Sequence, residues 1–322
     1  MILIVAYPGE EHSEEVMRRL EQAGHEVILL DLSDFSGRAS LTLAWMPDVE
    51  PSFLVQREGG TVELTNTRVG WWRRVRPFTI HPSIIDPSMR AFAESETSQA
   101  VSGMLDALPC TWVNNRAADE VAHHKPYQWS VAQAVGLRVP KTLVASDAAS
   151  AREFVNCMEP GKTVFKSFIA MTESWRETRL VETSDLEHLD AVHYAPVIFQ
   201  EYIPGVDLRI TIVGDTVFAA EIDARDTRYP VDMRMVVGEA NVRAVELPDS
   251  LDAALLELQR RLGLSYGAID MRRTDKGEYV FLENNPAGQW MFVELRTGLP
   301  ISQAMANLLA RLDGEPTAGV HA

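Results

Sequence analysis

Cysteine is scarce in this chain of 322 residues, which contains only Cys110 and Cys157. Two cysteines cannot form a disulfide framework, and no His or Cys residues stand at the spacing of a zinc site. No apolar run approaches the length of a membrane span. The apolar start at residues 1–6 is too short for a signal peptide and has no basic flank. These absences predict a soluble protein of a reducing compartment, the cytoplasm, without a membrane partner.

Positive charge is also in short supply, because 46 acidic residues face 30 basic ones and the net charge is −16. Such a balance argues against a protein held to nucleic acid by general electrostatics. An anionic substrate would have to find a local basic patch. Arg73, Arg74 and Arg76, beside Trp71 and Trp72, are one candidate. They could equally be the solvated end of a strand next to packed tryptophans.

Hydrophobic residues make up 46% of the chain, enough for two or three compact modules. The pattern predicts an α/β (α+β) protein that opens with a βαβ unit, strand 2–6, helix 13–23 and strand 27–30. The expected domains are an N-terminal domain at 1–115, a small α+β subdomain at 116–196, an antiparallel-sheet subdomain at 197–313 and a mobile tail at 314–322.

Further elements are expected along the chain. They are an inserted antiparallel hairpin within 34–70, helices at 89–108, 185–192, 251–262 and 301–312, and strands at 197–202, 208–213, 217–222 and 233–237.

The last acidic run carries the strongest chemical signal. Two short strands, 267–271 and 279–282, flank the hairpin-turn residues Lys276 and Gly277. Pairing these strands would bring Asp270, Glu283 and Asn285 to one edge. Hard oxygen ligands without Cys or His suit Mg²⁺, which usually accompanies nucleotide phosphates. The alternative is an ordinary hairpin with solvated acids at its end.

Four upstream features could complete a site for metal-bound ATP. Lys125 begins a helix and Lys166 ends a strand, so both ammonium groups could face phosphates. An apolar strand, Phe199-Gln200-Glu201-Tyr202-Ile203-Pro204, runs into a Pro-Gly turn whose free backbone groups could bind adenine. Asp207 and Arg209 lie two residues apart on one face of a strand. Taken one at a time, the two lysines could be ordinary solvated side chains. Asp207 and Arg209 could be no more than a surface ion pair.

The order of these residues along the chain resembles that of the ATP-grasp superfamily, and the run 207–215 resembles its RimK-like branch, whose members ligate a carboxylate to an amine. Four further motifs resemble the graspetide maturases, the microviridin-type peptide macrocyclases. They are Trp71-Trp72-Arg73-Arg74, Gln200-Glu201-Tyr202-Ile203, Val231-Asp232-Met233-Arg234 and Asn285-Pro286-Ala287-Gly288-Gln289-Trp290. The resemblance extends over nearly the whole chain and makes residues 1–115 a pre-ATP-grasp domain.

The resemblance implies a role for each matching residue. Lys125 and Lys166 would hold the ATP phosphates, and Gln200, Glu201, Tyr202 and Ile203 would form the adenine hinge. Asp207 would bind the ribose. Arg209 would face the γ-phosphate or an acyl phosphate, which makes it and Lys166 the catalytic candidates. Asp270, Glu283 and Asn285 would hold two Mg²⁺ ions. A precursor peptide as partner and a homodimer are also implied.

One loop and one single residue depart from the family pattern. Many ATP-grasp enzymes have a glycine-rich loop after the second lysine, whereas residues 168–177 contain no glycine. Graspetide maturases tend to have Val-Asp-Trp-Arg where Met233 replaces the tryptophan here.

Three functions remain open from the sequence. The first is a ligase that joins Asp or Glu side chains of a precursor peptide to Ser/Thr hydroxyls or Lys amines. The second is a RimK-like ligase that adds a free amino acid to a protein or small molecule. The third is a nucleotide-binding module without turnover.

Overall fold

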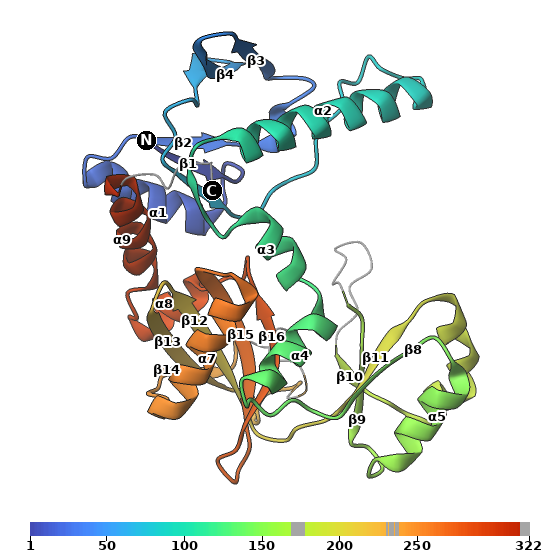
Figure 1. Ribbon diagram of the computed structural model, residues 1–322. Coiled ribbons are helices and arrows are strands. Elements are labelled where there is room, and N and C mark those ends of the chain that lie inside the picture. The colour runs from blue at the N-terminus through green and yellow to red at the C-terminus, as the bar shows by residue number, and fades with distance from the viewer. Residues whose placement is uncertain (169–177, 230, 232–234, 236–237, 316–322) are drawn as a thin grey trace. The chain divides into compact units, whose positions relative to one another are not determined.

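The computed structural model describes residues 1–168, 178–229, 231, 235 and 238–315. The chain divides into two compact units. Unit 1 comprises Met1–Ala118 and Pro300–Ala322, and unit 2 comprises Asp119–Leu299. Both units mix helices with strands, so the predicted α/β (α+β) class is confirmed (Figure 1).

A parallel four-stranded sheet forms the centre of unit 1. Its strand order is β2-β1-β6-β7, with bounds Val27–Leu30, Ile2–Val5, Val69–Trp72 and Thr111–Val113. All four residues of β1 are buried, as expected for a strand covered on both faces. Helix α1 (Glu11–Gln22) connects β1 to β2, which confirms the predicted βαβ opening.

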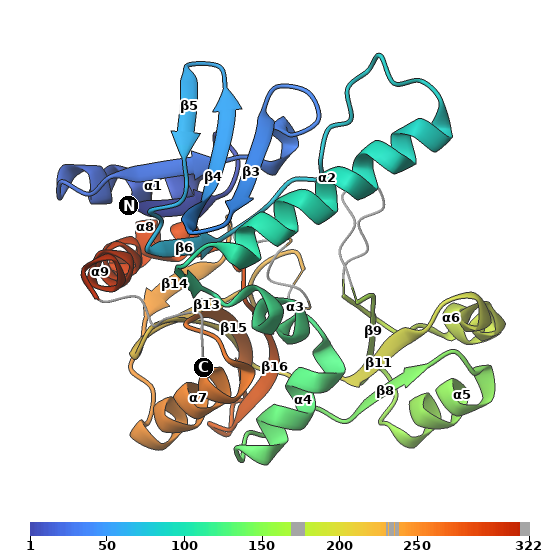
Figure 2. The ribbon, with the colours of Figure 1, turned by 45° about the horizontal axis from the view of Figure 1, so that its top comes forward.

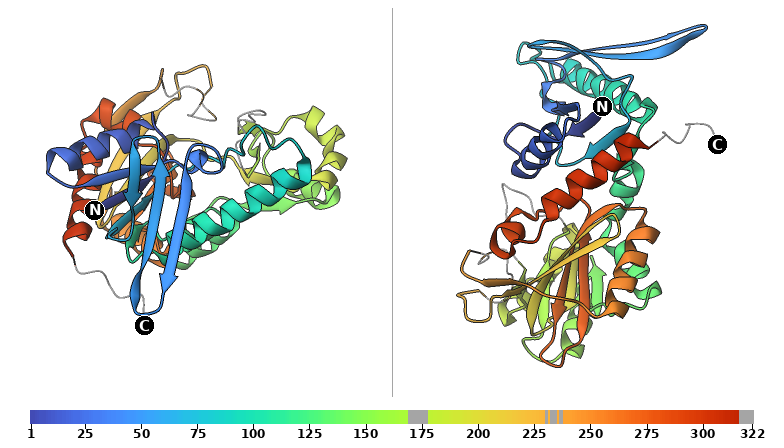
Figure 3. Two further views of the ribbon diagram at one scale, coloured as in Figure 1. Left: turned by 90° about the horizontal axis from the view of Figure 1, so that it is seen from above. Right: turned by 90° about the vertical axis from the view of Figure 1, so that its left-hand side faces the viewer.

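Two long helices complete the core of unit 1. Helix α2 (Pro87–Ala107) buries Val101, Met104 and Leu105 in the cluster that also contains Leu3 and Val5. The last helix, α9 (Ile301–Gly314), packs against α1 (Figures 1 and 3). The sequence boundary at 197–313 placed this helix with the C-terminal subdomain. Its apolar face instead belongs to unit 1.

The inserted segment of unit 1 forms a separate antiparallel sheet. Strands β3 (Ser40–Met46), β4 (Val49–Arg57) and β5 (Gly60–Glu63) lie side by side (Figure 2). The predicted hairpin is therefore a three-stranded meander, because a second turn at Gly59 and Gly60, both with positive φ, returns the chain once more. A short 3₁₀ helix, η1 (Leu32–Asp34), precedes it.

Unit 2 contains a small antiparallel sheet of order β10-β9-β11-β8. Its strands are Arg179–Leu180, Thr163–Lys166, Val197–Glu201 and Thr142–Ala145, and its helices are α5 (Ala148–Cys157) and α6 (Thr183–Glu187). The predicted helix at 185–192 is wrong in its bounds. The Asp185 carboxylate accepts a hydrogen bond from the Glu182 backbone N–H at 2.8 Å, so α6 begins earlier. A 3₁₀ helix, η2 (Leu189–Tyr194), follows α6.

The larger sheet of unit 2 has five antiparallel strands in the order β14-β13-β12-β15-β16. Their bounds are Asn241–Ala244, Thr216–Asp223, Val206–Val213, Tyr266–Arg273 and Tyr279–Asn285. In β12, Leu208, Ile210 and Ile212 face a core that also holds Leu255 and Leu258 of α7 (Asp249–Leu262). The alternate residues of β12 therefore point to the opposite face of the sheet.

Three further helices connect or follow these strands along the chain. They are α3 (Arg116–Ala122), α4 (Lys125–Ala134) and α8 (Met291–Thr297). Helix α4 packs against β16 and α7 within unit 2.

Several predictions lie outside the described residues. They concern the glycine-free loop after Phe168, the substituted motif at 232–234 with Met233, most of the strand expected at 233–237, and the tail at 316–322. Among the helices that the structure describes, none combines the length and apolarity needed to cross a membrane.

Candidate active site

Three charged residues form one row across the larger sheet. Arg209 of β12 is in register with Asp270 of β15, which is in register with Glu283 of β16. Directly opposed residues on antiparallel strands share a face of the sheet, so these side chains are neighbours. The Arg209 Nη1 donates to Asp270 Oδ1 at 2.8 Å.

The predicted strand pairing is confirmed, since it sets Asp270 opposite Glu283, but these two acids do not stand at the ends of their strands. Both strands continue past the carboxylates, β15 to Arg273 and β16 to Asn285, so Asp270 and Glu283 meet on the face of the sheet. The predicted turn at Lys276 and Gly277 is confirmed, since the Gly277 N–H donates to the Thr274 carbonyl at 2.9 Å.

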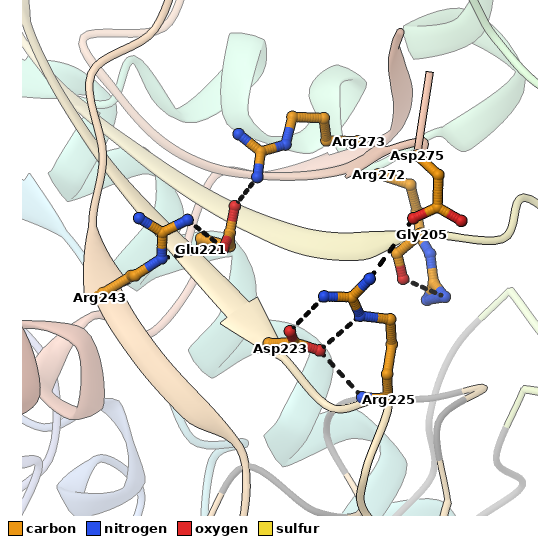
Figure 4. Close-up of polar contacts among 8 residues, drawn as sticks. All are labelled: Gly205, Glu221, Asp223, Arg225, Arg243, Arg272, Arg273 and Asp275. Carbon is orange, nitrogen blue, oxygen red and sulfur yellow. Dashed lines mark hydrogen bonds and ion pairs between the residues drawn. The ribbon is translucent and has the colours of Figure 1, made fainter. Parts of the chain in front are cut away.

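Asp207 and Arg209 share one face of β12, as predicted. Each of them forms an ion pair with a residue of the neighbouring strand β15. Arg272 of β15 donates from Nη1 to both Asp207 carboxylate oxygens, at 3.0 and 3.2 Å. Its Nη2 donates to the Gly205 carbonyl at 3.3 Å (Figure 4). Two ion pairs between directly opposed residues, Asp207–Arg272 and Arg209–Asp270, therefore link β12 to β15.

The guanidinium of Arg209 is held closely from the turn after β16. Its Nη2 donates to the Gln289 carbonyl at 2.9 Å. A Cβ on Gly288 would lie 2.9 Å from that Nη2 and 2.3 Å from the Cβ of Ala268. The glycine in the 285–290 motif therefore lets the turn approach Arg209.

Helix α4 brings Lys125 to the same face. Lys125 is the first residue of α4, directly after the N-cap His124. Its ammonium group forms an ion pair with Glu283, and both side chains are about one fifth exposed, 17% and 23%. The predicted cation for phosphate and the predicted metal ligand are thus direct neighbours.

The expected hinge, residues 200–203, begins within β11 of the smaller sheet and continues past its end. The Gln200 side-chain amide donates to Thr142 Oγ1 at 2.8 Å, and Glu201 Oε2 accepts from the Lys141 N–H at 3.2 Å. The Tyr202 backbone N–H donates to the Lys162 carbonyl at 2.8 Å. The side chains of Gln200 and Glu201 therefore fasten the segment to β8 and to the residue before it.

One cavity of unit 2 collects most of the predicted residues. It is lined by Lys125, Lys166, Gln200, Glu201, Tyr202, Ile203, Asp207, Asp270 and Glu283. Arg209 is not among the lining residues but pairs with Asp270, which is. Asn285 does not line the cavity; it is opposite Ala268, two pairs beyond Asp270 and Glu283, and its Oδ1 accepts from the Ala287 N–H at 3.1 Å.

Other residues of this cavity were not predicted as site residues, namely Val164, Ser167, Phe168, Thr178, Leu208, Val231, Arg272 and Leu282. Arg272 had a detectable signal, because it continues the polar alternation of β15 two residues after Asp270. The apolar members had none, since such residues look like ordinary core positions.

The donor set fits magnesium chemically. Asp270 and Glu283 supply carboxylate oxygens, and Mg²⁺ is commonly held by one or two carboxylates together with substrate phosphates. Within the part of the chain that the structure describes, no three His, Cys, Asp or Glu side chains gather as a metal cluster. The site therefore does not resemble an all-protein cage for a metal ion.

The basic patch considered near the tryptophans lies in unit 1 and is largely neutralised. Arg73 is buried and its Nη2 is 3.4 Å from Glu10 Oε1. Arg76 donates to Asp31 at 2.7 Å. These arginines stabilise the carboxyl ends of parallel strands, and only Arg74 of the three is exposed without an ion pair among the interactions described.

Comparisons with known proteins identify relatives of the whole chain. Residues 1–120 match the family described as the MvdD pre-ATP grasp domain. The macrocyclase MdnC from Microcystis aeruginosa MRC, solved with the precursor peptide MdnA, is 30% identical. The match covers 96% of this chain and 99% of MdnC, with a TM-score of 0.86. This chain belongs to the graspetide maturases, the ATP-grasp peptide macrocyclases.

Two further structures share the fold of this graspetide maturase. One is a RiPP-associated ATP-grasp ligase from Chryseobacterium gregarium, in complex with ADP and a leader and core peptide. It is 24% identical over 100% of this chain and 99% of that one, with a TM-score of 0.86. The other is the ATP-grasp ligase PsnB, complexed with minimal precursor, Mg and ADP. It is 22% identical over 97% of both chains, with a TM-score of 0.77.

The predicted ATP-grasp fold is therefore confirmed for this graspetide maturase. A comparison with curated proteins gives no match.

Proposed function

We propose that this graspetide maturase uses ATP to activate Asp or Glu side chains of a ribosomal precursor peptide and joins them to Ser/Thr hydroxyls or Lys amines. One observation carries the proposal. A single cavity of unit 2 combines two lysines, two carboxylates in register and an apolar wall. These are the groups that a magnesium-bound nucleoside triphosphate requires.

The nucleotide would lie along this cavity. Apolar side chains such as Val164, Phe168 and Leu282 would flank the adenine ring, while the backbone of the 200–203 segment would hydrogen-bond its edge. Asp207, oriented by Arg272, would accept hydrogen bonds from the ribose hydroxyls. Lys125 and Lys166 would contact the phosphates.

Asp270 and Glu283 would hold Mg²⁺, with Asn285 as a further oxygen donor from the same strand as Glu283. Two Mg²⁺ ions held by these residues would supply positive charge that offsets the charge of the phosphate oxygens. Lys125 pairs with Glu283 and Arg209 pairs with Asp270, so both cations lie beside the proposed metal site.

The chemistry runs in two displacements. A peptide carboxylate oxygen attacks the γ-phosphorus of ATP, the bond to the β-phosphate oxygen breaks, and ADP leaves behind an acyl phosphate. A hydroxyl or amine then attacks the acyl carbon, the bond to phosphate breaks, and the nucleophile's proton leaves with inorganic phosphate. Lys166 and Arg209 would stabilise charge that develops on the phosphoryl oxygens. Each crosslink removes one water from the peptide.

Mass spectrometry tests the proposal directly. We expect the protein, Mg-ATP and the peptide encoded beside its gene to give mass losses in steps of one water, with one ADP per crosslink. Replacing Asp270→Asn or Glu283→Gln should lower turnover at least about 100-fold, because charge stabilisation of the transferring group is lost. Circular dichroism should show an unchanged fold for both variants.

The other functions would give different results. A mass gain on the acceptor would favour a RimK-like ligase that adds a free amino acid. If ADP release stays at background with every carboxylate offered, a silent nucleotide-binding module would be the better description.

The proposal includes a homodimer as the form in which the enzyme works. Light scattering of the purified protein measures its mass, and a mass of one chain at working concentration would contradict the homodimer.

A further inference from the structure

A chain of three buried side-chain amides lies behind the candidate metal site. Gln128 of α4, Asn284 of β16 and Gln259 of α7 are each only 2 to 3% exposed. They sit within a core that is otherwise rich in Leu and Ile. Buried amides in such surroundings cost free energy unless they are hydrogen-bonded. Their arrangement therefore calls for an explanation beyond packing.

Gln128 hydrogen-bonds the backbone of β16 as a neighbouring strand would. Its Oε1 accepts from the Asn284 N–H at 2.7 Å, and its Nε2 donates to the Asn284 carbonyl at 2.7 Å. The same Nε2 donates to the Ala122 carbonyl at 2.5 Å. Since β16 is the last strand of its sheet, this side chain covers an edge that would otherwise be open.

The hydrogen bonds of α4 bracket Glu283. Trp129, the next residue of the helix, donates from its indole N–H to the Leu282 carbonyl at 3.0 Å. Residues 282 and 284 are therefore both fastened to α4. The same helix begins at Lys125, whose ammonium pairs with Glu283. Helix α4 thus fixes the backbone on each side of this carboxylate and supplies its cation.

The amide of Asn284 anchors the strand from the opposite face. Because side chains alternate along a strand, Asn284 points away from the face that carries Glu283 and Asn285. Its Nδ2 donates to Gln259 Oε1 at 2.9 Å. A Cβ on Gly267 would lie 2.2 Å from Gln259 Nε2 and 2.5 Å from Asn284 Oδ1. Gly267 therefore leaves the space that this amide pair needs.

The amide chain is not optimised for stability alone. Gln259 Nε2 and Asn284 Oδ1 are buried and have no hydrogen-bond partner among the residues described. Unsatisfied buried polar atoms destabilise a fold, and apolar side chains of the same size would pack here at lower cost. Partners that orient a ligating carboxylate are known to tune metal sites strongly.

We propose that Gln128, Asn284 and Gln259 are positioning residues that set the Glu283 carboxylate against Asp270 for magnesium-nucleotide binding. The proposal rests on the proposed function, since it concerns the same metal site. None of the three side chains is expected to touch the nucleotide. They act by holding β16 in place, with Gly267 as the residue that makes room.

Nucleotide binding measured at increasing Mg²⁺ concentration tests the proposal. In Gln128→Met, which keeps the side-chain length but removes both hydrogen bonds to Asn284, the Mg²⁺ concentration for half-maximal ADP binding should rise about 10-fold or more. Gly267→Ala perturbs the Gln259–Asn284 end of the amide chain and should also raise the Mg²⁺ concentration for half-maximal ADP binding. ADP affinity without Mg²⁺ should change less than about 2-fold in both variants.

Two controls separate positioning from general destabilisation. Gln133→Met makes the same chemical change at an exposed position of α4 and should leave binding and Tm unchanged. Val131→Ala truncates a buried residue of α4 and should lower Tm without altering the Mg²⁺ requirement. Hydrogen exchange of the 282–285 backbone should accelerate in Gln128→Met but not in Gln133→Met.

The outcomes are distinct. If the unaltered protein binds Mg-ADP and Gln128→Met shows the same Mg²⁺ requirement, the positioning proposal is overturned while the proposed function stands. If the unaltered protein does not bind Mg-ADP at all, both are overturned.

Discussion

At the scale of single residues, Glu221 shows how a buried acid depends on its surroundings. It is 4% exposed in the middle of unit 2's larger sheet. Arg243 donates to its Oε1 from Nε and Nη2, at 3.0 and 2.6 Å, and Arg273 pairs with its other oxygen (Figure 4). Charged hydrogen bonds on both sides compensate for the burial of its charge.

Replacing Glu221→Gln should therefore lower the free energy of unfolding by about 2 kcal/mol, the range for hydrogen bonds to charged groups after allowance for the partly exposed arginines. Urea denaturation measures this change.

Asp223, two residues along the same strand, provides a matched control. It pairs with Arg225, whose side chain is 55% exposed, so Asp223→Asn should cost less than about 1 kcal/mol. Equal losses for the two variants would contradict the role of burial.

At the scale of elements, the junction of β1 and α1 is a pH-sensitive cap. Glu10 is the N-cap residue of α1; its Oε2 accepts from the Ser13 N–H at 2.7 Å. His12 Nδ1 lies 2.8 Å from Glu10 Oε1, and because an ionised carboxylate only accepts, this ring nitrogen carries the proton. Burial alone would raise the pKa of Glu10, but His12 and Arg73 outweigh it and lower the pKa to about 2.

The pKa of His12 is also lowered, chiefly by burial. Both groups therefore bind protons more readily in the unfolded chain than in the folded one, so stability falls as the pH falls. His12 begins to contribute to this loss below its usual pKa of 6.5, and Glu10 contributes from about 4.5 down to about 2.

Urea midpoints between pH 7 and pH 3 should accordingly decrease. The Glu10 part amounts to at most about 3 kcal/mol when complete. Glu10→Gln should flatten the profile below pH 4.5, whereas Glu21→Gln, at an exposed position of the same helix, should leave it unchanged. An unaltered slope in Glu10→Gln would contradict this account.

At the scale of the whole molecule, the two compact units do not follow the order of the chain, because segments from both ends of the chain form unit 1. Unit 1 needs the last helix, because α9 buries Ile301, Met305, Leu308 and Leu309. Asp313 of α9 also accepts from the N-terminal ammonium at 2.9 Å. The residues of the candidate active site all lie within 119–299.

Ending the chain after Leu299 should therefore unfold or strongly destabilise unit 1, since each buried side chain of this size contributes about 1.5–3 kcal/mol. Mg-ADP affinity should remain within about 2-fold of the full chain. Calorimetry of unfolding and of binding measures both. Met305→Ala in the full chain is a milder version and should lower the stability of unit 1 by about 2–5 kcal/mol. A truncated chain with unit 1 intact would contradict the packing role of α9.

Much of the fold could be read from local patterns. The apolar run at 2–6, the turn at Lys276 and Gly277 and the alternation in 207–213 each specify a local structure through side-chain period or turn chemistry. The order of the lysines, the hinge and the acids was enough to suggest the ATP-grasp fold. Secondary structure at 183–194 was harder, because a capping box decided the start of α6.

Sequence alone determined which residues carry charge and which strands they belong to. Only the tertiary structure decided how those charges pair, because a partner of Asp207 or Arg209 can come from any strand that packs beside β12. It also decided that α9 joins the first unit, and that three amides from α4, α7 and β16 meet behind Glu283. Contacts of this kind join residues more than 20 positions apart, and no local pattern encodes them.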